Sequence, residues 1–235
     1  MNNEAKEKKI SHGLKLAMIR AGAALLAAII LLACTGLSAF TLIRGAQEPE
    51  SLLKVEDGAF VKRDVFAILG FYGEEVSGKD KVTARFAVIP VEGKLATVRF
   101  SERYLESAMA VQNSTYDFVN GKVETLDKYV KIQGTATQLS EEQSGLMYDW
   151  FGLNKSQLVS MNFISDTDDY ADYLTDTVIL VDTVNYRSQN LVVALNIIAA
   201  LCLVYFAAEL VLMAAGFYHP GKKKDDGVQP PMPPQ

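Results

Sequence analysis

Two long apolar stretches lie near the ends of the chain, and between them apolar residues alternate with polar ones. Residues 21–43 carry no charge, and residues 191–217 hold one ionisable group, Glu209. The first stretch has 23 residues, which as a helix would measure about 34 Å and cross a hydrocarbon core of about 30 Å. The pattern predicts transmembrane helices over 16–43 and 190–217, with a separate domain over 45–187.

Within that domain the spacing of apolar positions switches between two residues and about 3.6. The period of two predicts strands, over residues 64–72, 82–88, 95–100, 129–135 and 177–184. Glu92-Gly93 is typical of a hairpin turn between the second and third strands. Helices are predicted after Ser101 and after Ser140, where Ser140 and Gln143 form a capping-box pattern. The order predicts an α+β extracytoplasmic domain with a mostly antiparallel, bent sheet, flanked by two transmembrane α-helices. A small open barrel is one way to close this sheet.

Basic residues flank the outer ends of the two apolar stretches. Five precede the first stretch, Lys6, Lys8, Lys9, Lys15 and Arg20, and Lys222–Lys224 follow the second. Basic flanks stay on the cytoplasmic side of a membrane. The sequence therefore predicts a multi-pass protein of the cell membrane with both termini cytoplasmic. We expect residues 1–15 to form a cytoplasmic lead, residues 219–235 to form a disordered, proline-rich cytoplasmic tail, and the central domain to be extracytoplasmic.

The first apolar stretch also admits two other interpretations. Leu31-Leu32-Ala33-Cys34 resembles the cleavage box of a bacterial lipoprotein, and small residues after Cys34 permit an ordinary signal-peptidase cut. The apolar run continues to Ile43, however, where a processed protein usually becomes polar. We expect a retained helix, and each alternative leaves the domain outside.

Charge and composition exclude several functions of the domain. Acidic residues outnumber basic ones in 45–187, so the basic surface that nucleic-acid binding needs is missing. The domain has no histidine and no cysteine, which excludes thiol catalysis, Ser-His-Asp triads and the usual zinc ligand sets. We expect a non-enzymatic protein with no cofactor. Its expected partners are the lipid bilayer and either another membrane protein or a second copy of the chain.

The densest group of carboxylates follows residue 165. Asp166, Asp168 and Asp169 lie within four residues, with further aspartates up to Asp176. Clustered carboxylates can bind calcium, but this segment lacks the turn glycine of an EF-hand loop. The simpler interpretation is an acidic linker whose aspartates cap local turns.

Glu209 is a second candidate for interaction because it lies within an apolar stretch. A carboxylate inside a membrane usually faces a partner group rather than lipid. Arg20, near the cytoplasmic edge of the predicted helix 16–43, is the basic residue of that helix closest in depth to Glu209. We therefore expect Glu209 to pack against another helix, with Arg20 as its partner within the chain. The alternatives are a protonated or snorkelling bystander and an ion or proton path, which two helices could form only in an oligomer.

Four short segments resemble a known group of proteins. They are residues 57–61 (DGAFV), 84–91 (ARFAVIPV), 102–104 (ERY) and 130–134 (VKIQG). Over about 55–185, and in its two-helix layout, the chain is similar to uncharacterised two-pass membrane proteins of Gram-positive gut bacteria. The resemblance implies location and fold and carries no activity. We therefore expect a binding or scaffolding module at the cell surface. The alternative is an accessory subunit of a transporter or envelope complex that acts through its helices and Glu209.

Overall fold

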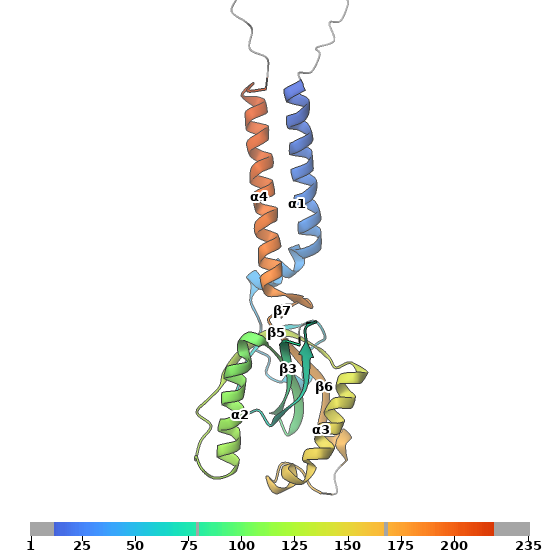
Figure 1. Ribbon diagram of the computed structural model, residues 1–235, viewed down its shortest axis with the longest axis vertical. Helices are drawn as coiled ribbons and strands as arrows, with labels where there is room; N and C mark the ends of the chain where they lie inside the picture. Colours follow the sequence, from blue (N-terminus) through green and yellow to red (C-terminus); the bar gives the residue numbers. More distant parts are fainter. Residues whose placement is uncertain (1–11, 79, 167–168, 219–235) are drawn as a thin grey trace, which may run out of the picture. The chain divides into compact units, whose positions relative to one another are not determined.

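The computed structural model describes residues 12–78, 80–166 and 169–218 (Figure 1). These residues form four α-helices and eight strands, with short 3-10 turns between them. The α-helices are α1 (His12–Arg44), α2 (Leu105–Val119), α3 (Glu141–Ser160) and α4 (Gln189–Ala214). The strands are β1 (Phe60–Val65), β2 (Gly70–Val76), β3 (Val82–Val91), β4 (Lys94–Ser101), β5 (Val130–Gln138), β6 (Leu174–Val181), β7 (Thr183–Val184) and β8 (Arg187–Ser188). The 3-10 turns are η1 (Leu52–Lys54), η2 (Glu102–Tyr104) and η3 (Tyr170–Asp172).

The chain divides into two compact units. Among the described residues, one unit contains residues 12–34 and 195–218, and the other contains Thr35–Ala194. The first unit is built from most of α1 and α4. Both of these helices are long and apolar enough to cross a membrane. Within this unit, Ala17, Ala21 and Ala28 of α1 and Ala199 of α4 are buried.

The second unit is an α+β domain around a six-stranded sheet with the order β1-β5-β6-β4-β3-β2. Its neighbouring strands are antiparallel except for β4 and β6, which run parallel. This confirms the predicted α+β class and mostly antiparallel sheet. The sheet has two edges, β1 and β2, and the described residues form no closed barrel.

Helices α2 and α3 cover opposite faces of this sheet (Figure 1). Alternate residues of β4 face them, because successive side chains of a strand point to opposite sides. Val98 and Phe100 pack in a core with Ala108 and Val111 of α2. Leu95 of the same strand packs on the other face, in a core with three residues of α3, Met147, Phe151 and Leu158. Both faces of the sheet are therefore apolar, which explains the near-continuous apolar runs of β3 and β4.

Two local predictions are confirmed residue by residue. Glu92 and Gly93 both have positive φ, 52° and 79°, as a two-residue hairpin turn of type I′ requires. At the start of α3, the hydroxyl of Ser140 accepts a hydrogen bond from the Gln143 amide, and the Gln143 side chain accepts one from the Ser140 amide. Each satisfies a backbone donor that the helix leaves free.

Three predictions of element boundaries are wrong. The predicted strand 64–72 is two strands, β1 and β2. Between them the Ile68 amide donates to the Thr115 hydroxyl of α2 at 3.1 Å, and the chain rejoins the sheet at Leu69, whose amide donates to the Val88 carbonyl of β3 at 2.9 Å. Ser101 does not cap the helix, because its hydroxyl donates to Asp182. The predicted strand 177–184 breaks at Asp182, whose φ of 65° is incompatible with a continuing strand.

The short β7–β8 hairpin joins the sheet to the start of α4. Its turn residues Asn185 and Tyr186 both have positive φ. The Tyr186 hydroxyl donates to Asp57 at 2.8 Å, and the Thr137 hydroxyl donates to the other oxygen of Asp57 at 2.7 Å. These hydrogen bonds, from Thr137 and then Tyr186, hold the pKa of Asp57 below its ordinary value. Inside the Thr35–Ala194 unit, this hairpin is thus tied to the sheet by a charged group.

Candidate functional site

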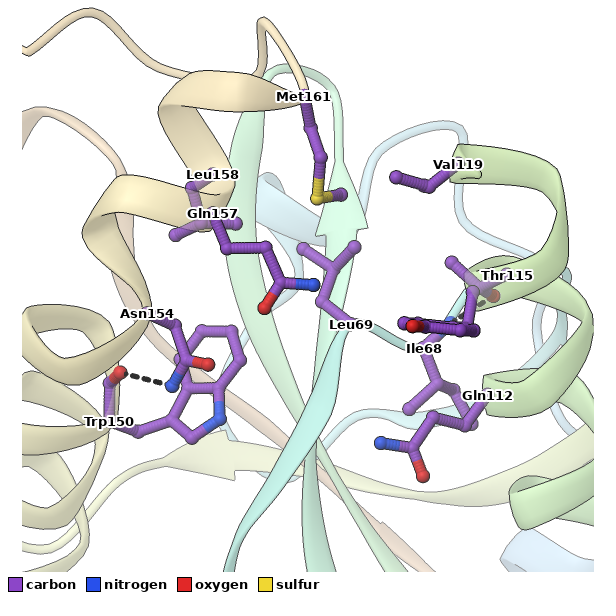
Figure 2. A pocket seen from close by; sticks show the side chains of 11 residues that line it. Ile68, Leu69, Gln112, Thr115, Val119, Trp150, Asn154, Gln157, Leu158 and Met161 are labelled. Carbon is purple, nitrogen blue, oxygen red and sulfur yellow. Dashed lines mark hydrogen bonds between the residues drawn. The ribbon is translucent and has the colours of Figure 1, made fainter. Parts of the chain in front are cut away.

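A crevice in the α+β domain is the best-formed candidate site. Figure 2 shows α3 on one side, α2 on the other, and residues of the β1–β2 loop between them. Its volume is about 60 Å³. None of the lining residues has a charged side chain. They are Ile68, Leu69, Gln112, Thr115, Tyr116, Val119, Trp150, Asn154, Gln157, Leu158 and Met161.

The floor of the crevice is fixed by the fold. The break between β1 and β2 brings Ile68 and Leu69 under the two helices, and the hydrogen bond from the Ile68 amide to Thr115 holds the loop against α2. Ile68 and Leu158 are almost fully buried. These apolar side chains form a rigid base, since they belong to the two cores of the domain.

Trp150 forms one wall of the crevice, and the absence of a side chain at Gly70 sets its position. A Cβ built on Gly70 of β2 would lie 2.8 Å from the indole Nε1 of Trp150. The indole therefore rests directly on the strand backbone. Trp150 is the only tryptophan of the chain, so the optical and magnetic signals of an indole report on this crevice alone.

Three carboxamide side chains complete the lining. Gln112 comes from α2, and Asn154 and Gln157 come from α3 (Figure 2). The Asn154 amide donates to the Trp150 carbonyl at 2.7 Å. Within the described part of the chain, no side-chain hydrogen bond is formed by the amides of Gln112 and Gln157. A crevice with an apolar floor, an indole wall and unengaged amides suits an uncharged ligand that also forms hydrogen bonds.

The unit built from α1 and α4 contains a second polar cluster, around Glu209. The structure brings Arg20 and Glu209 together, with 3.1 Å between the guanidinium Nη2 and Oε1. Tyr205 and Tyr218 donate to the two carboxylate oxygens at 2.8 and 2.7 Å. The Glu209 side chain is 5% exposed. Its charge is thus compensated within the chain.

Sequence reasoning placed Arg20 beside Glu209 but missed the two tyrosines. Tyr205 could have been found, since it precedes Glu209 by four residues and so lies on the same face of α4. Tyr218 follows the end of α4, and no helical spacing predicts its position.

The aspartates after residue 165 do not converge in the described part of the chain. The ammonium of Lys155 donates to the backbone carbonyl of Asp166 at 2.7 Å and lies 4.0 Å from its carboxylate, which is 87% exposed. Asp169 is exposed, and Asp168 lies outside the described residues. Among the residues that the structure describes, no group of three or more carboxylates, histidines or cysteines is placed to bind a metal ion.

A buried polar pair under α3 is structural. The hydroxyls of Tyr72 and Thr97 lie 3.0 Å apart, and burial raises the pKa of Tyr72 to about 12. This phenol therefore stays protonated at any physiological pH and cannot serve as a base. The pair satisfies two polar groups within the core around Met147.

The fold and the crevice define a class of protein, a small α+β domain inserted between two helices that are long and apolar enough to cross a membrane. The chain belongs to the family defined by the domain of unknown function DUF8577, whose model matches residues 4–212. The match covers α1, the whole α+β domain and α4 up to residue 212. No curated protein matches the chain. No solved structure matches it either.

Proposed function

We propose that the protein is a two-pass integral membrane protein whose domain is held outside the cytoplasm as a non-enzymatic binding module. The observation that carries the proposal is the crevice of Figure 2, an uncharged, partly apolar site in a domain bounded by two apolar helices. Concave, mostly apolar sites with a few polar groups are the usual form of a ligand site.

Length and charge support the membrane part of the proposal. Helices α1 and α4 have 33 and 26 residues, and about 20 apolar residues suffice to cross a bilayer. The basic residues before α1, in its first turns and after α4 favour cytoplasmic termini. The resemblance to membrane proteins of Gram-positive gut bacteria supports a place at the surface of such a cell.

The polar groups of the crevice favour binding over catalysis. Its lining offers amides, an indole and hydroxyls, and none of these is a strong base or nucleophile without an activating neighbour. The Thr115 hydroxyl is already engaged, because it donates to the Val111 carbonyl at 2.9 Å. We therefore propose recognition of a ligand with no chemical step.

The contacts of Glu209 favour this module over an accessory subunit of a transporter. An accessory role through Glu209 would leave its carboxylate facing a partner helix. Here Arg20, Tyr205 and Tyr218 of the same chain occupy it. We assign Glu209 the role of pairing the two helices.

The proposal is tested by placing a charge in the crevice. The full chain is labelled with 5-fluorotryptophan, which gives one fluorine signal from Trp150, and is held in lipid nanodiscs. It is titrated with uncharged fragments such as isobutanol, N-methylacetamide and methyl glucoside. We expect at least one fragment to shift the signal in a saturable way.

Two matched variants show where a fragment binds. Val119→Asp puts a carboxylate at the rim of the crevice, and Val123→Asp puts one at a position outside it; these two valines are 39% and 40% exposed. We expect binding to be lost in Val119→Asp and kept in Val123→Asp. If no fragment shifts the signal of the wild-type chain, the crevice is not a ligand site and the proposal is wrong.

A further inference from the structure

The size of the crevice limits what can enter it. A buried cavity of about 150 Å³ takes up a benzene molecule, whereas the volume here is about 60 Å³. The space below the rim therefore takes a small group only. Because the crevice is open, the rest of a larger ligand can remain outside.

The chemistry of the lining restricts the charge of the group that enters the crevice. None of the lining side chains is charged, and a charged group brought against Ile68, Leu69 and Leu158 would lose its hydration without a counter-ion. The Trp150 face adds apolar surface on one wall (Figure 2). The buried part of the ligand is therefore aliphatic and uncharged.

The amides indicate what surrounds this aliphatic group. Gln112 and Gln157 come from opposite walls of the crevice (Figure 2). A carboxamide has the donor and acceptor of a peptide bond, so it can donate to a backbone carbonyl and accept from a backbone N–H at the same time. Because these two amides lie on opposite walls, each can hydrogen-bond one of the two peptide groups that flank a side chain inserted between them.

We propose that the crevice binds a peptide segment whose aliphatic side chain, of the size of leucine, enters between α2 and α3. Gln112 and Gln157 hydrogen-bond the flanking backbone, and Trp150 packs against the inserted side chain. This inference rests on the proposed function, since it names the ligand class of the same site.

The test uses three blocked peptides with the sequence acetyl-Gly-Ser-X-Ser-Gly-amide, in which X is Leu, Gly or Asp. Each is titrated into the full chain in nanodiscs, with the fluorine signal of labelled Trp150 as the readout. N-acetylglucosamine and methyl glucoside are titrated in parallel. We expect saturable binding of the leucine peptide, and binding at least about tenfold weaker for the glycine and aspartate peptides, because they lack the apolar group that would be buried.

Substitutions then locate the backbone contacts. The double variant Gln112→Ala/Gln157→Ala is expected to weaken the leucine peptide at least about tenfold, since two hydrogen bonds to it are lost. Asn113→Ala removes an exposed amide next to Gln112 that does not line the crevice, and it should leave the affinity unchanged. Val119→Asp should abolish the response of Trp150.

The outcomes separate the ligand class from the proposed function. A response to a saccharide and none to the leucine peptide overturns the peptide proposal and leaves a binding module. Equal affinity for the leucine, glycine and aspartate peptides, or for the wild type and the double glutamine variant, also overturns it. No response to any peptide, saccharide or fragment overturns both proposals.

Discussion

Trp150, which forms one wall of the crevice, packs directly on Gly70. Adding one methyl group at Gly70 therefore displaces this wall. In Gly70→Ala the new Cβ would lie 2.8 Å from Nε1 and 2.9 Å from Cζ2 of the indole. Carbon atoms in contact lie about 3.5–4.0 Å apart. The ring must therefore move outward by roughly 0.6–1 Å, away from its rest on β2.

The expected cost follows from this overlap. Extra methyl groups in packed sites cost about 1–3 kcal/mol. For a unit of this size, 1 kcal/mol shifts the Tm by about 2–4 °C. We expect Gly70→Ala to lower the Tm by about 2–12 °C. We also expect the emission of Trp150 in the folded protein to shift to longer wavelength, because the displaced indole meets more water.

Gly73 of the same strand provides the matched control. The nearest atom to a Cβ at Gly73 is Cδ2 of Phe86 at 3.5 Å, an ordinary contact. Replacing glycine by alanine at a compatible site stabilises by about 0.4–1 kcal/mol, because the unfolded chain loses freedom. Thermal unfolding of the full chain in detergent, followed by Trp150 fluorescence, compares the two variants. Equal Tm values for Gly70→Ala and Gly73→Ala would refute the account of how Trp150 is positioned.

Three further predictions concern other parts of the molecule. Glu209→Leu should weaken the pairing of the two helices by about 1–2 kcal/mol, and Glu209→Gln should weaken it less. The measurement is the resistance of the intact chain to unfolding in SDS, and equal losses for the two variants would contradict the pairing role. The pKa of Asp57 is lowered by hydrogen bonds from Thr137 and Tyr186, so its contribution to stability is present above the ordinary carboxyl pKa and is lost as pH falls through the lowered value. Asp57→Asn should therefore reduce the loss of stability at acid pH, and an unchanged acid dependence of stability would contradict this prediction. Gly134→Ala should prevent folding of the domain, because a Cβ would lie 2.1 Å from a backbone oxygen of β6; a variant with a wild-type circular dichroism melt would refute this.

Much of the domain could be predicted from local signals. The Glu92-Gly93 turn and the Ser140 capping box depend on a few neighbouring residues, and the structure confirms both. The break in the predicted strand 64–72 could not be predicted, because it depends on a hydrogen bond from Ile68 to Thr115 in another element. The prediction for Ser101 is wrong for the same reason, because its hydroxyl donates to Asp182, which is far away in the sequence.

The candidate sites differ in the same way. Arg20 and Glu209 could be paired from the sequence because helical rise gives the depth of a residue along an apolar helix. The crevice could not, because Leu69, Gln112 and Trp150 lie about 40 residues apart in the chain. Only the packing of α2 and α3 at the two faces of the sheet brings them to one place.

The central claim is that the domain faces the outside of a cell whose membrane the two helices cross. Its most direct test is labelling of single cysteines in intact cells, with a maleimide that does not cross membranes. In a background of Cys34→Ala and Cys202→Ala, which removes both native cysteines, one variant carries Glu124→Cys at an exposed site of the domain. A second variant carries Lys222→Cys in the C-terminal tail. The account predicts that Glu124→Cys is labelled in intact cells and that Lys222→Cys is labelled only after the cells are permeabilised. Labelling of Lys222→Cys in intact cells, with Glu124→Cys protected, would contradict it.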